Sequence, residues 1–103
     1  MENHENQSIE KIIESISMIK HPAIDLSLTE LGIVQDIELV DDQVIATFAF
    51  PFSKIPIADK LISSVEQQVE KMGYKLEYIV RTMKADEKEK FLLLEKQAWK
   101  GLS

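Results

Sequence analysis

The feature that most restricts how this chain can fold is a pair of β-rich runs joined by a very short polar link. The first run covers residues 33–40 and the second covers residues 44–50. Asp41 and Asp42, with Gln43 at the border, form the link, and we interpret the two carboxylates as turn residues rather than as a metal-binding pair. Two runs of this kind predict an antiparallel hairpin. The hairpin is expected to form part of a sheet, and the segments before and after it then have to cover that sheet.

Helical patterns flank the hairpin on both sides. Isoleucines recur at helical spacing through the first segment, which His21-Pro22 is expected to end because a residue before proline avoids the α region. Pro56 suits the first position of a second helix, and Gly73 suits a left-handed position after its end. Asp86 and Glu89 resemble a capping box at the start of a third helix. The expected helices cover residues 8–20, 56–73 and 86–100, and the expected strands cover residues 33–40, 44–50 and 74–82.

The order of these elements is α-β-β-α-β-α. It predicts an α+β fold, a two-layer α/β sandwich in which helices cover a small mixed sheet. A chain of 103 residues is long enough for one domain with one core, so we expect a single domain over residues 1–103. Residues 1–7 precede the first helical pattern and are expected to form a flexible N-terminus.

The composition excludes several classes of function. The chain has no cysteine, which rules out disulfides, Cys-ligated zinc, Cys-ligated iron–sulfur clusters and thiol nucleophiles within it. A net charge of −6 argues against a nucleic-acid partner, because such proteins neutralise phosphates with Lys and Arg. The longest purely apolar run covers residues 91–94, far short of the roughly 20 residues of a membrane helix. The polar, acidic start does not look like a secretory signal, so we expect a cytoplasmic protein without a membrane partner.

The sequence contains none of the usual catalytic motifs. There is no G-x-S-x-G, no G-x-x-x-x-G-K-[ST] and no H-E-x-x-H, and the two histidines, His4 and His21, stand in different segments. No acid–base pair, nucleophile or cofactor loop can be named, and we therefore expect neither an enzyme nor a bound cofactor.

The loop between Pro51 and Pro56 is the most distinctive stretch. It precedes a helix N-terminus, where unpaired N–H groups favour an anion or a reactive side chain. Phe52 and Ile55 are apolar, however, and we interpret Ser53 and Lys54 as a cap and a solvated charge.

A known family is similar to this chain over residues 9–101. The run Ile19-Lys-His-Pro-Ala-Ile-Asp-Leu-Ser-Leu-Thr-Glu-Leu-Gly-Ile-Val-Gln-Asp-Ile37 resembles the opening of the MIP18-like domain, also called domain of unknown function 59. That family includes metal–sulfur cluster assembly factors, PaaD-like and SufT-like proteins. Its opening reads Asp-Pro-Glu, a gap, Leu-Gly, a hydrophobic pair and an aspartate. Pro22, Leu31, Gly32 and Asp36 match it at the right separations.

Two later stretches carry the same resemblance. Residues 47–59 look like the family's Thr-rich strand followed by a Cys-Pro helix start, and Pro56, Ala58 and Asp59 fit that pattern. Residues 86–101 resemble the C-terminal helix of stand-alone prokaryotic members.

The departures from the family pattern fall at its reactive positions. His21 stands where the family has Asp, Ala23 where it has Glu, and Ile55 where it has the cysteine before Pro56. The resemblance implies that this cysteine is an activated thiolate or cluster ligand, and isoleucine can be neither. The segments His21-Pro22-Ala23 and Ile55-Pro56 are therefore expected to form a degenerate reactive loop.

Our first hypothesis is a non-catalytic adaptor for iron–sulfur cluster assembly, which contacts assembly or client proteins without holding a cluster. Exposed apolar residues in the distinctive loop would form the contact. The competing interpretation is that they pack beneath the second helix. The candidate interface residues here are Phe50, Phe52, Ile55 and Ile57.

Two alternatives remain. The last helix is apolar on more than one side, through Leu92, Leu93, Leu94 and Trp99, which would suit a self-associating structural domain that forms a homodimer without a role in cluster chemistry. A third hypothesis is a metal site that combines His21 with Asp25 and Glu30.

Overall fold

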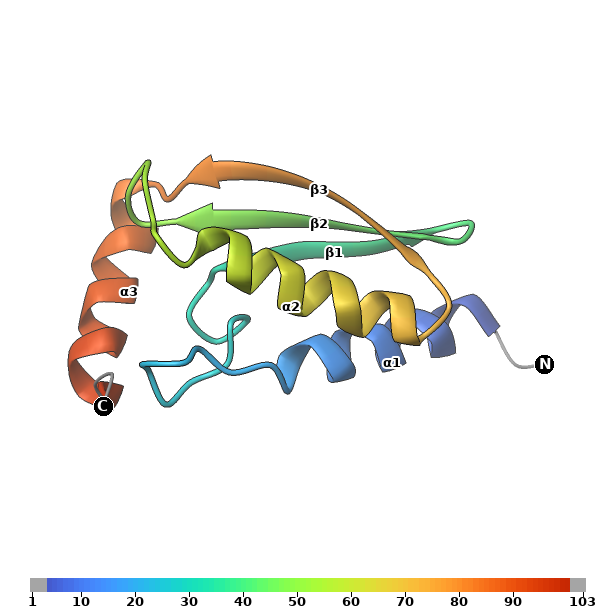
Figure 1. The fold of residues 1–103 in the computed structure, drawn as a ribbon, viewed down its shortest axis with the longest axis horizontal. Coiled ribbons are helices and arrows are strands. Elements are labelled where there is room, and N and C mark those ends of the chain that lie inside the picture. Colours follow the sequence, from blue (N-terminus) through green and yellow to red (C-terminus); the bar gives the residue numbers. More distant parts are fainter. Residues whose placement is uncertain (1–3, 101–103) are drawn as a thin grey trace.

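The computed structural model describes residues 4–100, and describes side-chain surroundings from residue 9 onward. Its order is α-β-β-α-β-α, so the chain has the predicted α+β fold. Helices α1 and α2 lie on the same side of the sheet, and α3 stands across the end where β2 and β3 finish (Figure 1). The elements are α1 (His4–Ser17), β1 (Val34–Val40), β2 (Gln43–Phe50), α2 (Ala58–Lys71), β3 (Lys75–Thr82) and α3 (Ala85–Ala98).

The sheet is mixed, as expected, and its order is β1-β2-β3. Strands β1 and β2 form the antiparallel hairpin, whereas β2 and β3 run parallel because α2 carries the chain back to the start of the sheet. Strand β2 lies in the centre, and its last five residues are all buried. Strand β3 is therefore an edge of the sheet.

A bulge interrupts β1. The register with β2 shifts by one residue there, next to Asp36, whose φ is 52°. Val34 pairs with Phe48, and Leu39 pairs with Val44, so Val34 and Leu39 lie on the same face of the sheet. The alternation of buried and exposed side chains along β1 therefore changes its phase at the bulge.

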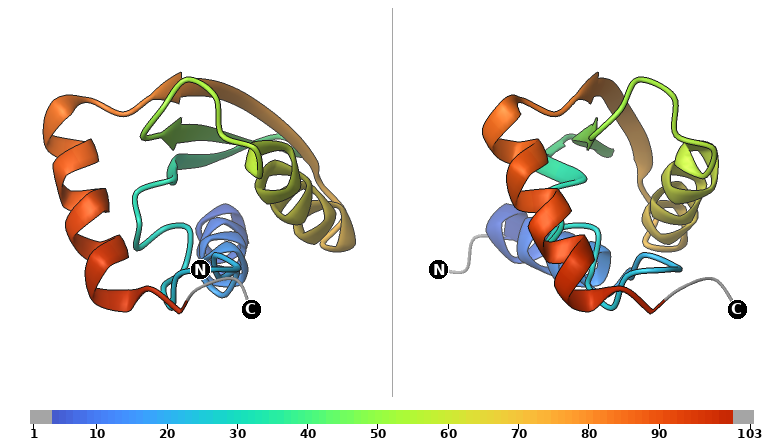
Figure 2. Two further views of the ribbon diagram at one scale, coloured as in Figure 1. Left: turned by 60° about the vertical axis from the view of Figure 1, so that its left-hand side comes forward. Right: turned by 90° about the vertical axis from the view of Figure 1, so that its left-hand side faces the viewer.

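The core lies between the sheet and the two helices beneath it. Phe48 is at its centre and is fully buried, with its ring centroid 6.4 Å from that of Phe50 and 5.5 Å from that of Tyr78. Figure 2 shows α2 and α3 on opposite sides of the molecule, with α1 below the sheet. The helical stripes supply the facing apolar side chains: Ile12, Ile16, Leu61, Val65 and Val69.

The first helix is displaced from its predicted range. It begins at His4, so residues 4–7 are helical, whereas residues 1–3 of the expected flexible segment lie outside the described residues. It ends at Ser17, where the N–H of Ile19 turns back to the carbonyl of Ile16 at 3.0 Å. Lys20 then pairs with Ser27 in an isolated β-bridge, so this pairing excludes Lys20 from the helix that we predicted.

The starts of the other two helices also differ from prediction. Pro56 lies in a turn that the N–H of Ala58 closes by donating to the Ile55 carbonyl at 3.0 Å, so α2 begins two residues later than expected. Helix α3 begins at Ala85 rather than at Asp86. The backbone N–H of Lys84 donates to the Glu87 carboxylate at 2.8 Å, so the acidic side of the capping box comes from Glu87.

Gly73 ends α2 as the sequence predicted. Its φ is +91°, its N–H donates to the Glu70 carbonyl, and the next N–H, of Tyr74, donates to the Val69 carbonyl. A Cβ at this position would meet nothing within 4 Å, so an alanine there would be strained only through its backbone.

Gly73→Ala is therefore expected to lower the free energy of unfolding by about 1–2 kcal/mol, the cost of a left-handed conformation for a residue with a Cβ. Urea unfolding measures the difference. Gly73→Asn is the matched control and should lose less, because asparagine tolerates this conformation better. Equal stability of the alanine variant and the unchanged protein would contradict this account.

Candidate functional site

Two distant segments of the chain meet in one apolar groove. Residues His21, Pro22 and Ala23 line one part of it, and Ile55 and Pro56 line another. The groove has a volume of about 320 Å³. The two segments that the family resemblance singled out, separated by more than thirty residues in sequence, thus lie beside one groove. The remaining lining residues are Ile33, Phe50, Pro51, Phe52, Ile57, Leu61, Phe91, Glu95 and Trp99.

The wall formed by residues 21–23 is fixed to the end of α3. The N–H of Lys100 donates to the Ala23 carbonyl at 2.9 Å, and the N–H of Asp25 donates to the Ala98 carbonyl at 2.8 Å. Ile24 and Trp99 form an isolated β-bridge between these bonds. We predicted that the last helix would continue to residue 100, but it ends at Ala98 because the chain becomes extended to make this bridge.

His21 is the buried polar group of this wall. Its Nδ1 accepts a hydrogen bond from the Ala23 N–H at 3.0 Å. Burial lowers the pKa of His21, and the positive charge of Lys100 lowers it further. Because Nδ1 accepts, the neutral ring carries its proton on Nε2. At neutral pH, His21 therefore presents an uncharged N–H donor and no positive charge.

The lowered pKa makes stability depend on pH. The unfolded chain binds a proton at His21 more readily than the folded chain, so this contribution is fully present above about pH 6.5 and is lost as the pH falls. We expect His21→Asn, whose amide oxygen can still accept from Ala23, to reduce the loss of stability between about pH 7.5 and about pH 5.5.

Urea unfolding of both proteins at the two pH values checks this expectation. His4→Gln removes the other histidine and serves as the control that should keep the pH response of the unchanged protein. A His21→Asn protein with an unaltered pH response would show that another group is responsible.

The aromatic side chains at the mouth of the groove differ in their exposure. Phe52 is 49% exposed and Trp99 is 53% exposed, whereas Phe50 is only 3% exposed. Phe50 therefore contributes to the floor of the groove rather than to an exposed surface, because it continues the buried strand β2 into the core. The Nζ of Lys88 lies 4.4 Å from the centroid of the Phe52 ring and places a positive charge beside the mouth.

The other residues proposed for an interface divide between two places. Ile55 and Ile57 are partly buried and line the groove. The sequence left open whether they form an exposed contact or pack beneath the second helix, and each of these two interpretations describes them only in part. Leu93 is exposed on α3 but does not line the groove. The predicted set of residues is therefore brought together except for Leu93.

Helix α3 contributes two residues, Phe91 and Glu95, that the sequence did not identify as part of a site. Phe91 and Glu95 line the groove one turn apart, and Trp99 follows after another four residues. Their spacing was the available signal, because residues four apart lie on the same face of a helix. Only His21 and Glu95 among the lining residues have titratable side chains, and the lining includes no thiol, hydroxyl or amine. This arrangement suits binding of apolar groups better than covalent chemistry.

The proposed metal site of His21, Asp25 and Glu30 is wrong. No group of three His, Cys, Asp or Glu side chains that could hold a metal ion occurs among the described residues. Asp25 instead pairs with the Lys20 ammonium at 3.2 Å. The Glu30 carboxylate accepts a hydrogen bond from the Ser27 N–H at 2.9 Å.

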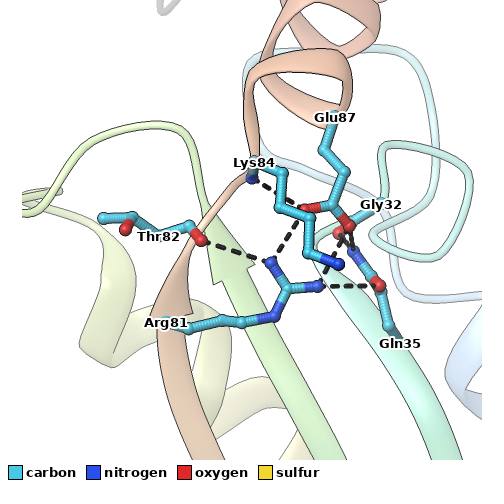
Figure 3. Close-up of polar contacts among 6 residues, drawn as sticks. All are labelled: Gly32, Gln35, Arg81, Thr82, Lys84 and Glu87. Carbon is cyan, nitrogen blue, oxygen red and sulfur yellow. Dashed lines mark hydrogen bonds and ion pairs between the residues drawn. The ribbon is translucent and has the colours of Figure 1, made fainter.

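A polar cluster holds the start of α3 against the sheet (Figure 3). The Arg81 guanidinium of β3 donates to both carboxylate oxygens of Glu87, at 2.7 and 3.0 Å. Gln35 of β1 bridges the Gly32 carbonyl at 2.7 Å and the Glu87 carboxylate at 2.8 Å. Hydrogen bonds from Arg81, the Lys84 backbone and Gln35 lower the pKa of Glu87 far below its usual range. This cluster fixes the helix that carries one wall of the groove.

No helix in the described part of the chain is long and apolar enough to cross a membrane.

Comparison with known proteins identifies the fold. No family model matches the sequence, and no curated protein matches it. Among solved structures, the chain is similar to the crystal structure of a domain of unknown function, DUF59, from Bacillus anthracis, with a TM-score of 0.61 and 16% sequence identity. The match covers 78% of this chain and 77% of that chain. The chain therefore has the fold of a DUF59 domain, in agreement with the resemblance of its sequence motifs.

Proposed function

We propose that this protein is a divergent member of the MIP18-like family that acts as a non-catalytic adaptor in iron–sulfur cluster assembly. In this proposal the groove between residues 21–23, the start of α2 and α3 receives an apolar segment of an assembly or client protein. The DUF59 fold supports the family assignment, and the spacing of Pro22, Leu31, Gly32 and Asp36 supports it independently. The cytoplasm is the expected compartment.

The observation that carries the proposal is the composition of the groove. Positions that the family resemblance marks as reactive converge on it, yet apolar side chains make up most of its surface. Phe52 and Trp99 stand exposed at its mouth, and aromatic residues of this kind are common anchors of protein interfaces. In this proposal the fold keeps the place of the family site, and the site has changed its chemistry from reaction to binding.

The groove does not fit an iron–sulfur cluster. Cluster iron is bound mainly by cysteine thiolates, and the chain has no cysteine. The family resemblance places Ile55 where the family has its cysteine. Among the lining side chains, only His21 and Glu95 could ligate a metal. We therefore assign the protein no step that passes through a bound cluster, and we treat clusters as cargo of its partners.

Binding experiments with purified iron–sulfur scaffold, carrier and client proteins test the proposal. Isothermal titration calorimetry should detect a complex with at least one of them, and the heat capacity change should be negative because apolar surface is buried. Failure to bind any protein of the panel would count against the adaptor function.

A self-associating structural domain is the second candidate. The exposure of the neighbouring side chains Leu92 and Leu93 on α3 favours it, because neither lines the groove and both are large and apolar. If this helix forms the contact, Leu93→Lys should convert a dimer into a monomer in sedimentation experiments. Unchanged sedimentation of that variant would reject a contact through Leu93.

A further inference from the structure

The end of α3 depends on one pairing of backbone segments for its position. Two hydrogen bonds and an isolated β-bridge join residues 23–25 to residues 98–100, and we call this pairing the seam. The first half of α3 is anchored separately, by the buried ring of Phe91 and by the bonds of the Glu87 carboxylate to the sheet. Every side chain from residue 96 to residue 100 is exposed or only partly buried. The seam therefore fixes the end of the helix.

His21 supports the loop side of the seam from within. It is only 8% exposed, and its Nδ1 accepts a hydrogen bond from the Ala23 N–H at 3.0 Å. The backbone N–H of His21 donates to the Leu26 carbonyl at 3.0 Å, which closes the loop behind it. The carbonyl of the same Ala23 accepts from the Lys100 N–H across the seam. One lone pair of His21 thus holds the residue that receives the end of α3.

A proton on Nδ1 would remove this lone pair. The imidazolium has two N–H donors and no acceptor, so its bond to the Ala23 N–H has to break and leave a buried donor unpaired. The ring would also carry a positive charge on one side of the seam, with Lys100 on the other. The Lys100 charge already lowers the pKa of His21, as expected for two like charges that repel. Protonation therefore weakens the seam by a lost hydrogen bond and by repulsion.

The other charged groups around His21 do not compensate for this loss. In its own loop, Lys20 and Asp25 pair with each other at 3.2 Å. The ends of β1 and β2 and the start of α2 line the groove with apolar side chains alone. Helix α3 contributes Glu95, the other titratable side chain among the described residues that line the groove. Attraction to Glu95 cannot restore the acceptor that Ala23 loses, because a protonated ring has no free lone pair.

We propose that His21 is the pH switch of the seam. The neutral ring holds residues 23–25 against the end of α3, and protonation of the ring releases that end while the anchored first half of the helix stays in place. Residues 21–23 and Trp99 both line the groove, so the release changes the shape of the groove and moves Trp99 away from it. The switch is a property of the free protein and does not depend on which partner the groove binds.

Amide hydrogen exchange followed by NMR at about pH 7.5 and about pH 5 tests the release. The N–H groups of Asp25 and Lys100 make the two hydrogen bonds of the seam, and their exchange is compared with the intrinsic rate at each pH. We expect their protection to fall at least about tenfold in acid, because each unit by which the pKa of His21 differs between the closed and the released seam changes the opening equilibrium about tenfold. The N–H of Ala49, which donates to the Ile33 carbonyl at 2.8 Å inside the sheet, should stay far better protected than both.

Trp99 gives an independent optical signal, because it is the only tryptophan of the chain. Its fluorescence spectrum should change as the pH falls below about 6.5, the pKa of an unperturbed histidine. Far-UV circular dichroism should stay constant over the same range, since the release leaves the helices and the sheet formed. A change confined to fluorescence separates a local release from unfolding of the domain.

Three variants identify the group that is responsible. His21→Asn can still accept from the Ala23 N–H but does not titrate, so it should abolish both responses. Lys100→Gln keeps the backbone bond of the seam and removes the like charge, so the release should require a lower pH. His4→Gln removes the other histidine and should respond as the unchanged protein does.

Two results would overturn the proposal. Asp25 and Lys100 that remain as well protected as Ala49 at about pH 5 would show that the seam survives the protonation of His21. A loss of protection that persists in His21→Asn would assign the response to a carboxylate instead. If this variant did not fold, Lys100→Gln would decide, because an unchanged transition there would contradict the repulsion across the seam.

Discussion

Replacing Phe48 with alanine is expected to destabilise the protein by about 3–5 kcal/mol, the largest effect of any single substitution that we predict. Phe48 is fully buried in the central strand, where its ring contacts those of Phe50 and Tyr78 and lies above the helices. The loss combines the transfer energy of a large aromatic side chain with the cost of the cavity left behind. A small domain has a total stability of about 5–15 kcal/mol, so a large part of it would disappear.

Phe52→Ala is the matched control, because it removes the same side chain from a position where about half of it is in solvent. We expect it to cost less than about 1 kcal/mol, including the loss of the Lys88 contact. Urea unfolding followed by circular dichroism measures both values. Similar losses for the two variants would mean that the centre of the core has been placed wrongly.

The second large effect concerns binding. The double variant Phe52→Ala/Trp99→Ala is expected to weaken the complex with an assembly or client partner at least about 30-fold, which is typical of removing anchor residues from an interface. Both side chains line the groove and are about half exposed, so their loss removes contact surface. The backbone bridge between Trp99 and Ile24 does not need the indole and should persist.

Leu93→Ala is the control for this experiment. Leu93 is an exposed apolar residue on α3 that does not line the groove, so partner affinity should be unchanged. Titration calorimetry gives the affinities, and thermal unfolding confirms that the variants are folded. If Leu93→Ala weakened the complex as much as the double variant, the contact would lie on the outer side of α3 instead of in the groove.

Much of the fold could be predicted because its signals are local. The periodic isoleucines of α1, the short acidic turn after Val40 and the glycine after α2 each determine the structure of a few neighbouring residues. The errors arose where contacts between distant residues determine the local structure. Lys20 pairs with Ser27 instead of continuing the first helix. Nothing in the sequence around Asp36 indicates the bulge that lies next to this residue.

The candidate site was predictable only in part. The resemblance to a family singled out His21 and Ile55, but their convergence on one groove depends on how α2 and α3 are placed around the sheet. The bridge formed by Gln35 between β1 and Glu87 joins residues 52 positions apart, and no sequence pattern indicates it. The exposure of Tyr78, Ile79 and Val80 in β3 was also not predicted, because a buried strand and an exposed apolar strand have the same residue types.

The most direct test of the central claim is anaerobic reconstitution of the purified protein with iron and sulfide, followed by its visible absorption spectrum. If the site of this fold has become a binding groove, the protein alone should show no charge-transfer absorption and retain no iron after desalting. A cluster spectrum that survives desalting and is lost in His21→Ala would contradict the claim, because it would show that the groove still holds a cluster.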